Sequence, residues 1–138
     1  MSEDSDAGDG ERTSAWMAKA LTHAYRLTAQ DQKALQELRA GTAMLIGIGG
    51  HRRGERILLW RERVTVGRDP GSLVLLPDST VSRRHAEFTK VGDTYEVADL
   101  GSMNGTYVND QPAQVAALAD GDEIRFGGNL FLFVRGTR

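Results

Sequence analysis

The sequence predicts a mainly β protein, an antiparallel β-sandwich preceded by two short helices. Short apolar or alternating runs follow one another after Gly41, and turn-forming residues separate them. Before Gly41, the apolar residues recur at helical spacing instead. Strands and helices do not alternate along the chain and no internal repeat is visible, which argues against an α/β fold.

The length and composition indicate one domain with an extension. A chain of 138 residues holds a domain of about 100 residues plus an additional segment. The net charge of −2 gives no global reason to expect binding to nucleic acid or to a membrane surface. Cysteine is absent, which excludes disulfides and thiolate metal sites and suits a reducing compartment. No apolar run reaches membrane-spanning length and the acidic N-terminus is unlike a signal peptide, so we expect a cytoplasmic protein.

The N-terminal part divides into a tail and a helical extension. Residues 1–12 are acidic and almost without apolar side chains, so they cannot bury enough surface to order themselves and are predicted to be disordered. Residues 13–40 are predicted to form two short helices. The first shows an apolar stripe formed by Trp16, Ala20, Ala24 and Leu27, with Met17 and Leu21 alongside. We expect this helix either to cover the sandwich or to serve as a docking element.

A capping signal marks the second helix. Thr28-Ala29-Gln30-Asp31 reads as a capping box, in which the Thr and Asp side chains satisfy free amides of the first turn. The apolar positions that follow, Ala34, Leu35 and Leu38, predict a helix that ends at Gly41.

Residues 41–138 are predicted to form the β domain. The predicted strands are Ala43–Ile48, Arg56–Leu59, Arg63–Val66, Leu73–Leu76, His85–Lys90, Tyr95–Asp99, Thr106–Val108, Glu123–Phe126 and Leu130–Val134. The clearest turn signals are Gly92-Asp93, Asn109-Asp110, Asp120-Gly121-Asp122 and Gly127-Gly128-Asn129. Glycines at positions 47, 49, 50 and 54 fit neither a dinucleotide nor a P-loop fingerprint and predict a hairpin turn.

Three polar clusters stand in predicted loops, where binding residues usually collect. They are Gly67-Arg68-Asp69-Pro70, Val81-Ser82-Arg83-Arg84-His85, and the segment from Asp99 to Thr106. Together they offer guanidinium groups, a hydroxyl, an Asn amide and flexible backbone amides. A phosphate ester carries about two negative charges and three acceptor oxygens, which Arg matches with a bidentate fork. The clusters therefore indicate a site for an anion attached to a peptide.

The same clusters resemble a known family. Gly67-Arg68, then Ser82-Arg83-Arg84-His85, then Asn104-Gly105-Thr106 with Val108-Asn109 match the forkhead-associated (FHA) pattern in order and spacing. The resemblance covers roughly residues 43–135. It implies an eleven-stranded β-sandwich whose loops bind phosphothreonine peptides at one end, and it implies neither an enzyme nor a cofactor.

The resemblance also assigns roles to individual residues. It implies that Arg68 is the main phosphate clamp, that Ser82 donates its hydroxyl to phosphate, and that Arg83 is a second loop contact. Asn104 would hold the peptide backbone. Met103 stands where a hydroxyl residue often assists, so that only its backbone would contribute. Gly67, His85 and Gly105 would brace the loops without touching the ligand.

A narrower resemblance points to regulation. The stretches 80–88 and 101–109 are similar to small bacterial regulators of the glycogen-accumulation-regulator and oxoglutarate-dehydrogenase-inhibitor type. Those relatives carry an N-terminal threonine that a Ser/Thr kinase phosphorylates and that then occupies their own FHA domain. Thr13 is the candidate here, although Arg12 stands where the relatives have another threonine, and Thr13 also suits a helix N-cap. The implied partners are a phosphothreonine protein or the chain's own tail, a Ser/Thr kinase and metabolic enzymes.

Other functions are less consistent with the residues. Ser82 and His85 suggest a nucleophile and base, but no orienting acid or Gly-x-Ser-x-Gly turn accompanies them. The three histidines lie on different predicted elements, so no metal site is expected. A basic cluster at 51–53, continued by Arg56, Arg61 and Arg63, leaves a nucleic-acid surface as a further alternative, with Trp60 as the one aromatic side chain beside it.

Overall fold

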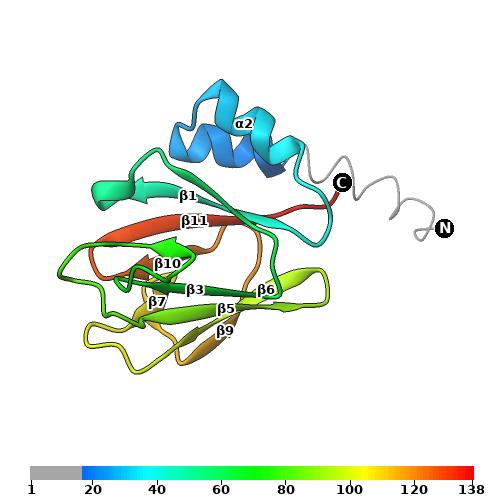
Figure 1. Ribbon diagram of the computed structural model, residues 1–138. Coiled ribbons are helices and arrows are strands. Elements are labelled where there is room, and N and C mark those ends of the chain that lie inside the picture. The colour runs from blue at the N-terminus through cyan, green and yellow to red at the C-terminus, as the bar shows by residue number, and fades with distance from the viewer. Residues whose placement is uncertain (1–16) are drawn as a thin grey trace.

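A computed structural model describes residues 17–138 and consists of two packed β-sheets with helices on one side. The first sheet has six strands in the order β2-β1-β11-β10-β7-β8, and the second has five in the order β4-β3-β5-β6-β9. The helices lie over β1 and β11, while β3, β5 and β6 form the opposite layer (Figure 1). The mainly β class predicted from the sequence is confirmed.

The strands follow the predicted runs closely. Those of the first sheet are β1 (Ala43–Gly49), β2 (Arg56–Leu59), β7 (Thr106–Val108), β8 (Gln111–Pro112), β10 (Glu123–Phe126) and β11 (Asn129–Arg135). Those of the second are β3 (Arg63–Gly67), β4 (Val74–Leu75), β5 (Ala86–Val91), β6 (Thr94–Asp99) and β9 (Val115–Ala117). The sequence prediction missed β8 and β9, which are short edge strands with largely exposed side chains. The β3–β4 pair is parallel, whereas the other pairs are antiparallel.

The main core lies between the two sheets. Its buried aromatic side chains are Phe88, Tyr95, Phe126, Phe131 and Phe133. The rings of Phe88 and Phe126 meet edge to face at 6.0 Å between centroids, and so do those of His85 and Phe126 at 5.7 Å. The aromatic core therefore continues up to one of the predicted loop residues, His85.

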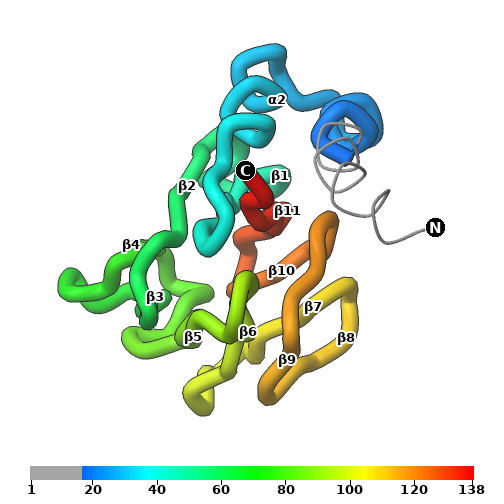
Figure 2. Tube along the Cα trace, turned by 90° about the vertical axis from the view of Figure 1, so that its right-hand side faces the viewer, coloured from blue at the N-terminus to red at the C-terminus, as the bar shows by residue number. Residues whose placement is uncertain are grey.

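A second apolar layer lies under the helices. The chain is helical at residues 17–25 and again in α2 (Ala29–Gln36). Buried side chains from both helices pack on the outer face of β1 and β11, and the cluster comprises Ala18, Leu21, Leu35, Leu38, Met44, Ile46, Leu132 and Val134. Figure 2 shows α2 and the first helix side by side above β1 and β11. Of the two readings of the first helix, the described residues support a cover on the sheet.

The packed face of the first helix differs from the predicted stripe. Ala18 and Leu21 are buried and Tyr25 is half-buried, whereas Ala24 is exposed. The face of the helix that packs on the sheet is therefore rotated from the predicted stripe: Ala18 and Tyr25 contact the sheet, and Ala24 does not. Trp16 and Thr13 lie outside the described residues, as does the acidic segment 1–12.

The start of α2 agrees with the sequence and its end does not. Thr28 Oγ1 accepts from the Asp31 amide and Asp31 Oδ2 accepts from the Thr28 amide, each at 3.0 Å, which completes the predicted capping box. Asp31, only 5% exposed, also bonds Arg56 on β2 at 2.6 Å. The helix ends at Gln36, ahead of Gly41, because Leu38 turns into the apolar layer and the Leu38 carbonyl accepts from the Arg138 amide.

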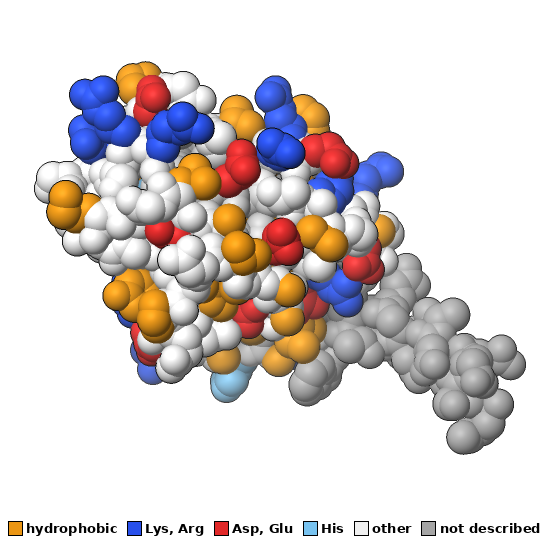
Figure 3. All heavy atoms as spheres, turned by 90° about the horizontal axis from the view of Figure 1, so that it is seen from below, with side chains coloured by type: hydrophobic (Ala, Val, Ile, Leu, Met, Phe, Trp, Pro, Cys, Tyr) orange, Lys and Arg blue, Asp and Glu red, His pale blue; other side chains and the backbone are white. Residues whose placement is uncertain are grey.

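The outer face of the second sheet carries no covering element among the described residues. One row across it is Thr65, Glu87, Ala98 and Val115, paired in register on β3, β5, β6 and β9. Figure 3, which looks at this face, shows apolar and acidic side chains scattered among uncharged ones. Within residues 17–138, no helix is both long and apolar enough to cross a bilayer.

Candidate functional site

The three predicted loop clusters meet at one end of the sandwich. The β3–β4 loop starts at Arg68, the loop before β5 runs through residues 77–85, and the β6–β7 loop covers residues 100–105. All three lie at the left-hand end in Figure 1, where β3 and β6 end and β5 begins. We call this end of the molecule the loop end.

Arg68 is tied to the neighbouring loop by its backbone and its side chain. Its amide donates to the Ser82 carbonyl at 3.0 Å, and its Nε donates to the Val81 carbonyl at 3.0 Å. The side chain is exposed, and its Nε bond aims the guanidinium along the loop before β5. The terminal nitrogens of such a guanidinium remain available as a two-donor fork for an anion.

Ser82 connects the second loop to the third. Its Oγ accepts from the Met103 amide at 3.0 Å, which leaves the hydroxyl proton free to donate. Met103 itself is 89% exposed, so its side chain contributes no contact that shapes the loop. Met103 therefore contacts the neighbouring loop through its backbone, because its amide donates to the Ser82 hydroxyl oxygen.

Asn104 lies across from the same loop. Its Nδ2 donates to the Thr80 carbonyl at 2.8 Å, and the Thr80 hydroxyl accepts from the Gly128 amide at 2.9 Å. The Asn104 side chain is exposed and its amide oxygen remains available as an acceptor. Arg68, Ser82 and Asn104 are therefore linked to one continuous loop segment, residues 80–82.

His85 braces the loops from beneath and is fully buried. Its Nδ1 accepts from the Ser82 amide at 3.1 Å and its Nε2 faces the Gly105 carbonyl at 2.9 Å. These partners assign the ring as a neutral imidazole that carries its proton on Nε2. One side chain thus contacts both the Ser82 loop and the Asn104 loop.

Two glycines allow this close arrangement. A Cβ at Gly67 would lie 2.0 Å from the Arg83 carbonyl oxygen, so no side chain fits there. Gly105 has a φ of +82°, the left-handed region that favours glycine. Arg83 is exposed, and its carbonyl also accepts from the Asp69 amide at 3.1 Å. The Arg83 side chain therefore stands at the rim of the loop end.

Asp99, which the sequence prediction did not single out, organises the β6–β7 loop. Its carboxylate accepts from the Gly101 and Ser102 amides at 3.0 Å, the Ser102 hydroxyl at 2.5 Å and the Thr106 hydroxyl at 2.8 Å. Burial acts to raise the pKa of Asp99, but these hydrogen bonds outweigh it and the pKa lies below its ordinary value. The signal in the sequence was an Asp two residues before a Gly-Ser pair, in Asp99-Leu100-Gly101-Ser102.

The low pKa of Asp99 makes the loop sensitive to acid. A carboxylate whose folded pKa is depressed contributes stability above its unfolded value of about 4, and that contribution is lost as pH falls through the folded pKa. Asp99→Asn removes the charge, and if its oxygen stays toward the two amides its NH₂ group faces two hydroxyls that now donate, so we expect a loss of about 1.5–3 kcal/mol at neutral pH. Urea unfolding of both proteins between pH 7 and pH 3 should show the difference shrinking in acid. A difference independent of pH would contradict this role.

The loop end presents several arginine side chains. Arg68, Arg83 and Arg84 are all exposed there. In Figure 3, Lys and Arg side chains gather at the upper left, toward the end that carries the loops. Guanidinium groups, a free hydroxyl and an amide in one place provide what a phosphate ester on a peptide requires.

The geometry does not favour the hydrolase alternative. His85 Nδ1 accepts from the backbone amide of Ser82, and the Ser82 hydroxyl bonds the Met103 amide. A general base must instead face the hydroxyl that it deprotonates. No cluster of three or more His, Cys, Asp or Glu side chains that could hold a metal ion occurs within the described residues.

The basic cluster near the β1–β2 hairpin is partly neutralised by ion pairs. Arg52 bonds Glu55 at 2.6 Å, and Arg56 bonds the buried Asp31. The Arg61 guanidinium lies 4.9 Å from the centre of the Trp60 ring. It therefore occupies a face of the aromatic side chain on which a nucleobase would stack. These arrangements do not favour a nucleic-acid surface.

Comparisons with known proteins agree with this geometry. The FHA domain family matches residues 64–127. The oxoglutarate dehydrogenase inhibitor of Corynebacterium jeikeium is 42% identical over 130 residues, covering 93% of this chain and 90% of the relative. The glycogen accumulation regulator GarA of Mycobacterium tuberculosis is 38% identical over 138 residues, covering 97% of this chain and 85% of the relative.

A solved structure supports the fold. An FHA domain from a study of phosphothreonine-dependent FHA domain interactions superposes with a TM-score of 0.62 at 38% identity, and the match covers 67% of this chain and 95% of that domain. The chain therefore belongs to the FHA-domain family, and within it to the group that contains the oxoglutarate dehydrogenase inhibitors and glycogen accumulation regulators.

Proposed function

We propose that this protein is an adaptor that binds phosphothreonine on a protein partner and has no catalytic activity of its own. The observation that carries the proposal is the link between Arg68, Ser82 and Asn104 through residues 80–82 at the loop end. In this proposal Arg68 clamps the phosphate, Ser82 donates its hydroxyl to it, and Asn104 holds the peptide backbone. Arg83 adds a contact at the rim.

A binding experiment tests this function directly. A library of phosphothreonine peptides, together with the same peptides unphosphorylated or carrying phosphoserine, would be offered to the full chain. We expect the phosphothreonine peptides to be retained and the unphosphorylated peptides to pass, because the latter lack the charge that the exposed arginines neutralise. Equal retention of the unphosphorylated set would refute the proposal.

The proposed biological partners are a Ser/Thr kinase and metabolic enzymes. One relative is named for inhibition of oxoglutarate dehydrogenase and another for regulation of glycogen accumulation. We infer that this chain also regulates a metabolic enzyme and that phosphorylation controls it. The proposed setting is the cytoplasm, which suits a chain that contains no cysteine.

The position of the first helix limits how phosphorylated Thr13 can reach the loop end. Leu21 lies 3.5 Å from where a Cβ at Gly121 would be, and Gly121 bonds Phe133, whereas Tyr25 bonds Glu123, farther along the sheet. The helix therefore starts near the end of β11, about 20 Å from the start of that strand at the loop end. The link from Thr13 to Met17 spans at most about 14 Å.

Self-binding in one molecule consequently requires the first helix to leave the sheet. After kinase treatment we expect the affinity of the full chain for an external phosphothreonine peptide to fall at least tenfold, because the tethered ligand competes at about millimolar effective concentration. Amides of residues 17–25 should also exchange faster with solvent. Thr13→Ala, treated in the same way, should change in neither respect.

Binding between molecules is the alternative for the same tail. If phosphorylation of Thr13 produces dimers by light scattering while residues 17–25 remain protected, the tail binds a second copy. An unchanged affinity after stoichiometric phosphorylation of Thr13 would remove self-occlusion in either form and would leave binding of an external partner.

A further inference from the structure

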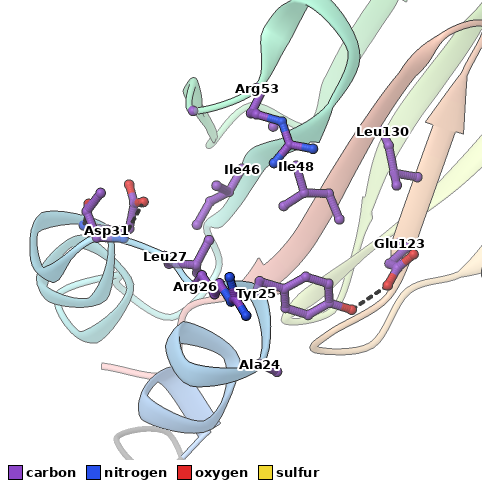
Figure 4. Close-up of a pocket in the computed structure, with 13 residues that line it drawn as sticks. Ala24, Tyr25, Arg26, Leu27, Asp31, Ile46, Ile48, Arg53, Glu123 and Leu130 are labelled. Atoms are coloured by element: carbon purple, nitrogen blue, oxygen red, sulfur yellow. Dashed lines mark hydrogen bonds between the residues drawn. The ribbon is translucent and has the colours of Figure 1, made fainter.

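A cleft separates the helical layer from the β1–β2 hairpin and has no part in the site described above. Its volume is about 540 Å³, and it opens to solvent between the turn at residues 26–28 and the end of β1. Its floor is apolar and consists of Leu27, Ile46, Ile48 and Leu130. Figure 4 shows these side chains converging on the cleft from a helix turn and two adjacent strands.

Two arginines stand at the rim of this cleft on different elements. Arg53 reaches over Ile48 from the hairpin, and Arg26 stands on the helical side (Figure 4). Of the carboxylates that also line the cleft, Asp31 is paired with Arg56 at 2.6 Å, whereas Glu123 accepts from the Tyr25 hydroxyl at 2.5 Å and keeps its negative charge beside that ring. The cleft therefore combines an apolar floor with two arginines at its rim and one carboxylate at the Tyr25 side.

The backbone around the cleft departs from regular geometry at two positions. Arg26 has a φ of +54°, so a non-glycine residue occupies the left-handed conformation at the end of the first helix. The β1–β11 register shifts between Gly47 and Gly49, which places a β-bulge at Ile48 on the floor. Strained residues and bulges of this kind concentrate at functional sites. Here both of them shape one cleft.

The cleft lies at the same end of the molecule as the phosphate-binding loops. Asn104 bonds the Thr80 carbonyl. Beyond Thr80 lies a depression of about 410 Å³ that is also lined by Asp78, His51 and Gly50, the last two from the 3₁₀ turn of the β1–β2 hairpin. The far side of that hairpin carries Arg53 and Gly54 at the cleft. A partner bound at the loops can therefore extend past the hairpin to the cleft.

We propose that this cleft is a second docking site, which takes an acidic segment of the phosphorylated partner carrying one apolar side chain. Arg26 and Arg53 pair with the acidic residues, and the apolar side chain covers Ile48 and Leu130. An open cleft beside the proposed peptide site suits a chain segment, because a small molecule would gain more from an enclosed cavity. The coupling of the two sites, and the assignment of the segment to a phosphorylated partner, rest on the proposed function.

The first test measures the cleft alone. The probe is an acidic hexapeptide that contains a single phenylalanine, followed in the full-length protein by the backbone amide signals of Ile48, Gly54 and Leu130. We expect these signals to shift, and to shift much less when the phenylalanine is replaced by serine or when the acids are replaced by amides. The proposal would be overturned if the peptide shifted none of these signals, including the case in which a small apolar acid, hexanoate, does shift them.

Two variants test the arginines of the cleft, and a third serves as their control. Arg26→Gly suits the left-handed backbone, so we expect undiminished stability toward unfolding together with at least threefold weaker probe binding. Arg53→Ala should weaken the probe similarly, whereas Arg61→Ala, an arginine stacked on Trp60 outside the cleft, should not. Unaltered affinity in both cleft variants would show that the arginines do not hold the acidic segment.

The second test joins the probe to a phosphothreonine peptide through Gly-Ser linkers of increasing length. We expect affinity to pass through a maximum about tenfold or more above that of the unlinked phosphopeptide, where the linker matches the span between the sites. Arg53→Ala should abolish the gain and leave the unlinked phosphopeptide unaffected. If the probe bound and no phosphopeptide did, the proposed function would be refuted, whereas the cleft would still be a docking site. If no linker length increased the affinity, the coupling of the two sites would be refuted.

Discussion

Arg68→Ala should weaken phosphothreonine peptide binding by about 2–5 kcal/mol, or roughly 30- to 5,000-fold in Kd, because removing one member of a desolvated charge pair leaves the phosphate without its partner. Arg68 is placed for this role by the bond from its Nε to the Val81 carbonyl and by the bond from its amide to Ser82. Calorimetry with one phosphopeptide measures the difference.

The controls for Arg68 separate charge from geometry. Arg68→Lys keeps the charge but loses the planar fork, so its affinity should lie between those of the wild type and Arg68→Ala. Arg83→Ala, at the rim, should cost less than Arg68→Ala, since a solvent-screened contact contributes little. All three proteins should unfold at nearly the same urea concentration, because Arg68 and Arg83 are exposed. If Arg68→Ala bound the peptide like wild type, the phosphate site would have to be sought elsewhere.

His85→Ala should destabilise the fold by about 3–5 kcal/mol and loosen the binding loops at the same time. The substitution leaves the Ser82 amide and the Gly105 carbonyl without a partner and opens a cavity beside Phe126. Because the imidazole ties two loops that share the proposed ligand, phosphopeptide affinity should fall even at temperatures where the variant remains folded. Urea unfolding and calorimetry at low temperature measure the two effects.

Another histidine is a suitable control for this prediction. His51 is exposed in the β1–β2 hairpin, so His51→Ala should leave stability nearly unchanged. A His85→Ala protein that is destabilised yet binds the phosphopeptide with wild-type affinity would show that His85 supports only the core. In that case the convergence of the loops would not depend on its ring.

The regular part of the fold could be predicted because local patterns and long-range packing agree. In β3 and β6, alternate side chains enter the core, and turn residues such as Gly92 adopt the left-handed φ that their chemistry favours. The short strands β8 and β9 escaped prediction because their side chains are largely exposed and show no alternation. These strands are defined by pairing with β7 and β6, and such pairing cannot be recognised in a segment of two or three residues.

In the candidate site, too, some residues could be predicted from the sequence and others could not. Arg68, Ser82 and Asn104 carry side chains typical of anion binding, so motif order was enough to select them, while their roles stay predictions. Thr80 and Asp99 were not selected, because Thr80 acts through bonds to residues distant in sequence and the turn signal at Asp99 is common in loops. The packed face of the first helix was also beyond reach, since the sheet beneath it decides which side of a weakly amphipathic helix is buried.

The order of the strands has a consequence for protein synthesis. β11 lies between β1 and β10, and it pairs with β1 across most of the domain's sequence, with Ala43 opposite Arg135. Neither the six-stranded sheet nor the apolar layer beneath the helices can assemble before β11 has been synthesised and has left the ribosome. A product that stops short of Asn129 would therefore be a substrate for chaperones and proteases, with no weakly active domain to release.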